Sequence, residues 1–121
     1  MASPVLSIVA PAYNEERNIP EFLAAIIPVL EGIGETFEII FVNDGSRDNT
    51  LGMLAAASSQ DPRIKVVGLA RNFGKDIALS AGLAHATGQA VIPIDCDLQH
   101  PVELIPAFVK KWREGDDMVL G

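Results

Sequence analysis

Short, nearly continuous apolar runs recur along the chain, and longer stretches between them alternate apolar and polar residues with a helical period. The runs are rich in Val and Ile and do not alternate strictly, which is typical of strands buried on both faces of a parallel sheet. They predict five strands, at residues 5–10, 37–42, 64–68, 90–94 and 117–120. Pro11 is expected to end the first of these strands.

The first two intervening stretches each predict a helix. The first helix begins at a variant of the capping box, Asn18 with Glu21, and is expected to kink at Pro28 before glycines end it. The second is capped by Asp48 and ends before Pro62. We expect three of its apolar side chains to point inward, namely Leu51, Leu54 and Ala55.

The last two helices differ in the size of their side chains. A small-residue helix runs to about Thr87, with Gly88 as its stop, and presents a face that can lie close to the sheet: Ala78, Ala81 and Gly82. The final helix opens at Pro101 and carries a stripe of larger apolar residues: Ile105, Phe108, Val109 and Trp112.

Strands that alternate with helices predict an α/β fold with a doubly wound, mostly parallel sheet. We expect the strand order 3-2-1-4, which reverses between the first and fourth strands. Ligands bind outside the carboxyl ends of the strands at such a reversal. The loops at residues 11–16 and 95–100, with Asp44 on the neighbouring strand end, should therefore form one crevice.

Composition narrows the possible functions. The 121 residues suggest one domain, and a hydrophobic content of 49% is enough for a folded core. A net charge of −7 argues against binding nucleic acid by neutralising phosphates. A single cysteine excludes an intramolecular disulfide and fits a reducing compartment. The sequence shows no signal peptide, and no apolar stretch reaches the roughly 18 residues of a membrane span.

Two carboxylates one residue apart, Asp95 and Asp97, end the fourth apolar run. In an extended segment they would face the same side, and Cys96 between them would turn towards the core. Two anions so close repel each other unless a proton or a cation separates them. Oxygen ligands at a strand end suit Mg²⁺ or Mn²⁺ shared with substrate phosphates. Two solvated loop carboxylates that cap the next helix are the alternative.

The usual phosphate motifs do not fit. No Gly-x-Gly-x-x-Gly follows the first strand, and the stretch from Gly68 to Lys75 has one residue too many between its glycines for a P-loop. Asp76 also stands where a P-loop places Ser or Thr. Lys75, at a helix start, can still contact a phosphate or be an ordinary exposed lysine.

Three further residues leave alternatives open. Tyr13 can lie against a nucleobase or simply pack over the sheet edge. His100 borders the acidic pair and either contacts a ligand or only precedes the helix. His85 is interpreted as structural.

Four loop motifs occur in order: Pro11-Ala12-Tyr13-Asn14-Glu15-Glu16, Asn43-Asp44-Gly45-Ser46, Arg71-Asn72-Phe73-Gly74-Lys75 and Asp95-Cys96-Asp97-Leu98-Gln99-His100-Pro101. Together they resemble the family 2 glycosyltransferases of GT-A fold, across the whole chain. The Asn-Phe-Gly-Lys and Asp-Leu-Gln-His-Pro stretches are most similar to the branch of dolichol-phosphate mannosyltransferases and polyprenyl-phosphate glycosyltransferases.

The resemblance implies roles for individual residues. It implies that the nucleotide site is lined by Pro11, Tyr13 and Glu15, with Lys75 and Cys96 also at the donor site. Asp44 would bind the base or ribose. The resemblance also implies that Mg²⁺ or Mn²⁺ and the diphosphate are surrounded by Asp95, Asp97 and Gln99. Two positions depart from the family pattern: Cys96 replaces a small residue, and Asn43 stands where many relatives carry a second Asp.

The implied reaction is inverting transfer of a sugar from a UDP- or GDP-sugar to a polyprenyl or dolichyl phosphate, at the cytoplasmic face of a membrane. Two alternatives remain open. One is a family 2 transferase that acts on a sugar hydroxyl, and the other is a non-catalytic nucleotide-binding module.

Residues 1–121 are expected to be the donor-binding N-terminal part of a longer GT-A domain. Such a part should bind nucleotide weakly and transfer little by itself. The interrupted edge of its sheet is expected to favour self-association.

Overall fold

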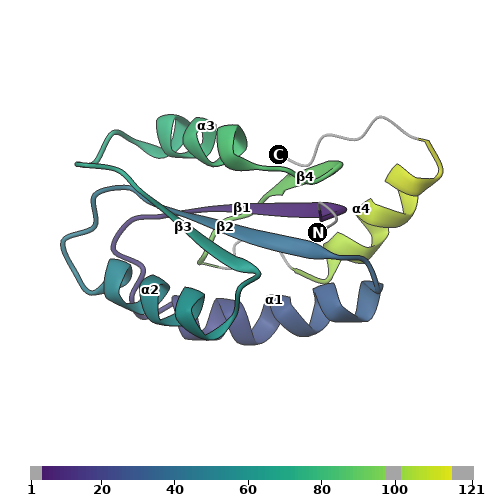
Figure 1. Ribbon diagram of the computed structural model, residues 1–121, viewed down its shortest axis with the longest axis horizontal. Helices are drawn as coiled ribbons and strands as arrows, with labels where there is room; N and C mark the ends of the chain where they lie inside the picture. Colours follow the sequence, from purple (N-terminus) through teal and green to yellow (C-terminus); the bar gives the residue numbers. More distant parts are fainter. Residues whose placement is uncertain (1–3, 98–101, 116–121) are drawn as a thin grey trace.

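The computed structural model describes residues 4–97 and 102–115 (Figure 1). Its strands are β1 (Leu6–Ala12), β2 (Phe37–Asn43), β3 (Ile64–Gly68) and β4 (Ala90–Pro93). Its helices are α1 (Ile19–Ile33), α2 (Thr50–Gln60), α3 (Lys75–His85) and α4 (Leu104–Arg113). The strand predicted at residues 117–120 and the helix start predicted at Pro101 lie outside the described residues.

The four described strands form one parallel sheet in the order β3-β2-β1-β4. This confirms both the predicted α/β class and the predicted strand order. The order reverses between β1 and β4, so the carboxyl ends of the central strands lie at the position where such sheets bind ligands.

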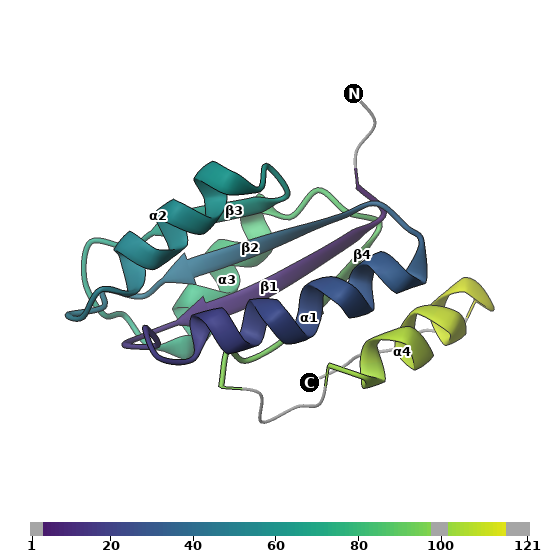
Figure 2. The ribbon, with the colours of Figure 1, turned by 90° about the horizontal axis from the view of Figure 1, so that it is seen from below.

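Helices cover both faces of the sheet (Figures 1 and 2). On one face α1 and α2 pack side by side, and α4 lies next to α1. The main apolar core lies between these helices and the sheet, where the ring of Phe22 meets Phe41 edge-on with centroids 5.8 Å apart. The stripe predicted for the last helix is confirmed in this core, with Ile105, Phe108 and Val109 buried.

On the opposite face, α3 lies close against β1 and β2. A Cβ atom added at Gly82 would lie 2.3 Å from Val9 Cγ1 and 3.0 Å from Val42 Cγ2, so only glycine allows this approach. Ala78 is fully buried beside it. The predicted small-residue face is therefore confirmed at Ala78 and Gly82, whereas Ala81 is only half-buried.

The prediction that Pro11 ends the first strand was wrong, because β1 continues to Ala12. Within β1, alternate residues turn their backbone groups to β2 and to β4. Val9 faces β4, where its carbonyl accepts from the N–H of Ile94 at 3.0 Å. Pro11 has the same orientation as Val9, and its missing N–H ends the β1–β4 ladder while leaving the β1–β2 ladder intact.

Two helix predictions were wrong, namely the capping bond of Asn18 and the inward face of the second helix. Asn18 has helical backbone angles and makes no capping bond, and its amide instead donates to Glu15 Oε2 at 2.8 Å. In α2 the inward face holds Thr50 and Leu54, whereas Leu51 and Ala55 are exposed. The hydroxyl of Thr50 donates to Asp48 in the preceding loop and accepts from the N–H of Glu15 in the loop after β1, which sets the rotation of the helix.

The small-residue helix also ends earlier than predicted, at His85 rather than near Thr87. The N–H and the hydroxyl of Thr87 donate instead to Glu38 Oε2, at 2.8 and 3.0 Å. Because both groups of Thr87 are used in this way, the chain leaves the helix before it.

At the amino ends of the strands, the buried carboxylate of Glu38 is the centre of a polar network. It accepts from the hydroxyl of Ser7 at 2.6 Å and from the ammonium of Lys65 at 2.7 Å, besides the two bonds from Thr87. Burial alone would raise the pKa of Glu38, but Lys65, Ser7 and Thr87 outweigh it and lower this pKa to about 2. The network joins β1, β2, β3 and the segment that precedes β4.

Replacing Glu38 by Gln should lower the free energy of unfolding at pH 7 by about 2 kcal/mol, because charge-assisted hydrogen bonds are lost. The pKa of Glu38 is lower in the folded chain, so its stabilisation is complete above the ordinary value of 4.5 and is lost as pH falls towards 2. Urea denaturation between pH 7 and pH 3 should therefore show a shallower pH dependence in Glu38→Gln. Glu31→Gln, in an exposed ion pair, is the control with little effect. An unchanged pH slope in Glu38→Gln would contradict the assignment.

Substituting Gly82 by Ala should destabilise the chain. Overpacking a dense core costs about 1–3 kcal/mol, which should exceed the gain of about 1 kcal/mol that alanine brings to a helix interior. Gly32→Ala in α1 is the matched control, because nothing lies within 4 Å of an added Cβ there, and it should stabilise. Chemical denaturation of both variants measures the difference, and equal effects at the two positions would refute the close approach of α3.

Candidate functional site

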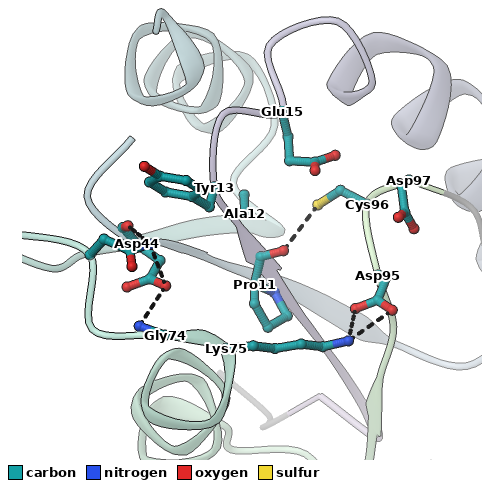
Figure 3. Close-up of a pocket in the computed structure, with 11 residues that line it drawn as sticks. Pro11, Ala12, Tyr13, Glu15, Asp44, Gly74, Lys75, Asp95, Cys96 and Asp97 are labelled. Atoms are coloured by element: carbon teal, nitrogen blue, oxygen red, sulfur yellow. Dashed lines mark hydrogen bonds and ion pairs between the residues drawn. The ribbon is translucent and has the colours of Figure 1, made fainter. Parts of the chain in front are cut away.

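A cavity of about 290 Å³ opens at the carboxyl ends of the strands (Figure 3). All four loops that follow a strand contribute to it. Its lining residues are Pro11, Ala12, Tyr13, Glu15, Asp44, Asn72, Gly74, Lys75, Asp95, Cys96 and Asp97. Every site residue predicted from the sequence lies in this set except Gln99, which falls outside the described residues.

The loop after β1 is held by the loop after β2. Asn14 adopts a left-handed backbone conformation with φ 54°, and its side-chain oxygen accepts from the N–H of Arg47 at 2.8 Å. The N–H of Asn14 donates to Ser46 Oγ at 3.0 Å, and the N–H of Glu15 donates to Thr50 Oγ1 at 2.9 Å. These bonds fix the segment that carries Tyr13 and Glu15 to the cavity.

Asp44 is buried and organises the loop after β3. Its carboxylate accepts from the N–H of Phe73 at 2.8 Å, the N–H of Gly74 at 3.1 Å and the amide of Asn72 at 3.2 Å. The side chain therefore positions a loop, a role that the sequence did not reveal. Its contact with a base or ribose stays a prediction.

The loops after β2 and β3 touch at Gly45, which has φ 69°. A Cβ atom here would lie 2.3 Å from the backbone of Arg71 and 2.3 Å from that of Asn72. Glycine is thus required both by the backbone angle and by the neighbouring chain.

Lys75, the first residue of α3, reaches across the cavity floor to Asp95 (Figure 3). Its Nζ lies 2.9 Å from Oδ1 and 3.0 Å from Oδ2 of this carboxylate. The hydrogen bond that the Lys75 ammonium donates to Asp95 raises the pKa of Lys75, so the ammonium stays charged. A contact between these two residues was not expected from the sequence.

The expectation that Asp95 and Asp97 lie in one extended segment was wrong from Cys96 onward. β4 ends at Pro93, and Cys96 and Asp97 lie in a turn, because Pro11 ends the ladder that would hold them. Both carboxylates nevertheless line the same cavity.

Cys96 is buried between the two aspartates. Its Sγ lies 3.6 Å from the carbonyl oxygen of Pro11, to which the thiol donates. Burial raises the pKa of Cys96 far above its ordinary value, and the carboxylates of Glu15, Asp95 and Asp97 raise it further. The buried thiol is therefore held in its protonated, weakly nucleophilic form.

The charges of the cavity indicate what it can bind. Among the described lining residues, four are carboxylates and Lys75 alone is basic. A diphosphate would be repelled by this excess of negative charge unless a divalent cation accompanied it.

The described residues contain no group of three or more His, Cys, Asp or Glu arranged to hold a metal. Mg²⁺ and Mn²⁺ do not need one, since one or two carboxylates with water and substrate phosphates suffice. Asp95 and Asp97 therefore fit such an ion.

A model of glycosyl transferase family 2 matches residues 7–121. An uncharacterized glycosyltransferase of Synechocystis is 56% identical over 114 residues, which cover 94% of this chain and 36% of that protein. A prophage bactoprenol glucosyl transferase homolog of Escherichia coli is 48% identical over 115 residues, or 95% of this chain and 38% of that protein. The chain thus spans less than two fifths of the length of these relatives.

A similar fold occurs in the solved structure of a mannosyltransferase from Pyrobaculum calidifontis in complex with GDP-Man and Mn²⁺. The TM-score is 0.71 at 28% identity, and the match covers 93% of this chain and 33% of that chain.

Replacing Asp44 by Asn should free the loop after β3, because the amide cannot replace a carboxylate that accepts from two backbone N–H groups and a side chain. We expect hydrogen–deuterium exchange at the amides of Phe73 and Gly74 to speed up about tenfold or more, in line with a charged hydrogen bond. Asp48→Asn is the matched control, since this carboxylate accepts from Glu16 and Thr50 instead. Unchanged exchange at both Phe73 and Gly74 in Asp44→Asn would show that the loop is held by other contacts.

Proposed function

The chain belongs to glycosyl transferase family 2, and on this premise we propose that it is the nucleotide-sugar-binding part of an inverting, metal-dependent polyprenyl-phosphate glycosyltransferase. The observation that carries the proposal is the convergence of all four strand-end loops on one acidic cavity. The donor in this proposal is a sugar linked to UDP or GDP, and the acceptor is a lipid phosphate.

The two sides of the cavity differ in chemistry, which supports a nucleoside diphosphate as the ligand. Tyr13 and Asp44 lie on one side, whereas Asp95 and Asp97 lie on the other (Figure 3). Tyr13 is 41% exposed, so its ring is available to stack on a base. In the proposal the base lies against Tyr13 and the diphosphate lies at the two aspartates.

Asp95 and Asp97 would hold Mg²⁺ or Mn²⁺, with Gln99 as the further ligand predicted from the sequence. The ion would neutralise the charge that develops on the departing nucleotide diphosphate. Glu15 lines the same cavity and adds to the negative charge that favours a cation there. Cys96, being buried and protonated, would only pack beneath the site.

A lipid-phosphate acceptor agrees with the bactoprenol named for one of the relatives. A phosphate monoester is largely ionised at neutral pH, since its second pKa is about 6. It therefore needs less help from a general base than a hydroxyl does. Its attack in a single displacement would invert the anomeric carbon.

The proposed place of action is the cytoplasmic face of a membrane. Among the described helices, none is long and apolar enough to cross a membrane.

Calorimetric titration with UDP and with GDP, each with and without Mn²⁺, tests the donor and metal site. We expect binding of at least one nucleotide to weaken at least about tenfold without Mn²⁺, the size of one well-placed charge interaction. Asp95→Asn and Asp97→Asn should each remove the metal dependence. Asp76→Asn is the matched control, because this acid lies in the first turn of α3 but does not line the cavity.

Heat without metal dependence would leave only a nucleotide-binding module, and no heat with either nucleotide would overturn the proposed donor site. A transfer assay of a form that binds, with polyprenyl phosphate and with a sugar hydroxyl as acceptors, separates the two classes of transferase.

A further inference from the structure

The ion pair between Lys75 and Asp95 occupies the carboxylate that the proposed function assigns to a metal. Both carboxylate oxygens lie within 3.0 Å of the Lys75 ammonium. Of the described residues around the cavity, Lys75 is the one that carries a positive charge. The pair therefore joins the ammonium of Lys75 to the carboxylate of Asp95, which is a metal ligand in the proposed function.

The backbone beside Lys75 is held independently of this pair. The preceding loop is tied to Asp44 through the N–H groups of Phe73 and Gly74. Lys75 itself begins α3, which packs against β1 and β2. Its Cα is thus anchored, whereas its side chain is 64% exposed and can move between partners.

We propose that Lys75 competes with the divalent cation for Asp95, so that metal and nucleotide diphosphate bind with positive coupling. This inference rests on the proposed function, because it takes Asp95 as the metal ligand and a diphosphate as the incoming anion.

The coupling follows from the shared partner. A cation that enters alone must separate Asp95 from the ammonium, and a diphosphate that enters alone must draw the ammonium away from Asp95. When the metal binds first, it releases the Lys75 ammonium for the diphosphate. When the diphosphate binds first, it releases the Asp95 carboxylate for the metal. The coupling is reciprocal, so each ligand raises the affinity for the other by the same factor.

A merely structural pair makes a different prediction. If Lys75 only tied α3 to the loop after β4, its removal would lower stability and leave the affinity for metal unchanged. The affinity for Mn²⁺ in the absence of nucleotide therefore separates the two roles.

The test is titration of the chain with Mn²⁺ alone, followed by the electron paramagnetic resonance signal of the free ion. Lys75→Met should bind Mn²⁺ roughly threefold to tenfold more tightly than the unsubstituted chain, the range expected for releasing a charged, partly exposed pair. Lys75→Arg retains a cation that can pair with Asp95 and should stay within about twofold of the unsubstituted chain.

Arg71→Met controls for the loss of one positive charge. Arg71 lies in the loop that precedes α3, with its guanidinium 4.8 Å from the Phe73 ring centroid, and does not line the cavity. It should shift the affinity for Mn²⁺ by less than about twofold, because charges in water are strongly screened. An equal gain in Arg71→Met and Lys75→Met would reduce the effect to net charge and overturn the inference.

The same titration with saturating UDP or GDP, whichever binds, measures the coupling. The factor by which nucleotide tightens Mn²⁺ binding should be smaller in Lys75→Met. Nucleotide-dependent binding of Mn²⁺ with no gain in Lys75→Met would overturn the role of Lys75 and leave the proposed function intact. No binding of Mn²⁺ under any condition would overturn both.

Discussion

The hydrogen-bond ladder between β1 and β4 stops where Pro11 has no N–H to donate, and the site depends on that early stop. The last backbone bond joins the N–H of Ile94 to the carbonyl of Val9 at 3.0 Å. Beyond it, the thiol of Cys96 donates to the Pro11 carbonyl. The acidic segment leaves the sheet at this point, and the space beside it becomes the cavity floor that Lys75 crosses (Figure 3). Because Pro11 lacks an N–H, the regular sheet ends here and the binding cavity begins.

Negative charge is compensated at the amino ends of the strands but is in excess at their carboxyl ends. At the amino ends, Glu38 is almost fully buried and its carboxylate is matched by Ser7, Lys65 and Thr87. At the carboxyl ends, the described residues that line the cavity include four carboxylates but one ammonium, that of Lys75, which pairs with Asp95. The first arrangement stabilises the fold, because every polar atom has a partner. The cavity at the carboxyl ends keeps a net negative charge that a bound cation can neutralise. A structural network such as that of Glu38 leaves no such excess.

Much of the fold and the position of the site could be predicted from the sequence. Apolar strands buried on both faces specified the parallel sheet and its order, and the order itself located the loops that line the cavity. The errors have a common physical origin. Whether Pro11 ends a strand or only one of its two ladders depends on which neighbour its backbone faces. The rotation of α2 depends on a bond that Thr50 accepts from Glu15 in a distant loop. Such facts are settled by pairing between remote segments, which local periodicity does not encode.

The site residues show the same division. The sequence identified Asp44, Lys75 and Asp95 as members of one site, since each follows or precedes an element in a recognisable motif. It did not identify their partners, because the bonds from Phe73 to Asp44 and from Lys75 to Asp95 join loops that are about 20 to 30 residues apart.

Gly45 has a further consequence for protein engineering. Because the backbone after β3 rests directly on this glycine, the two loops can be exchanged between related proteins only as a matched pair. A graft of residues 71–75 would have to bring its own turn after β2 with it.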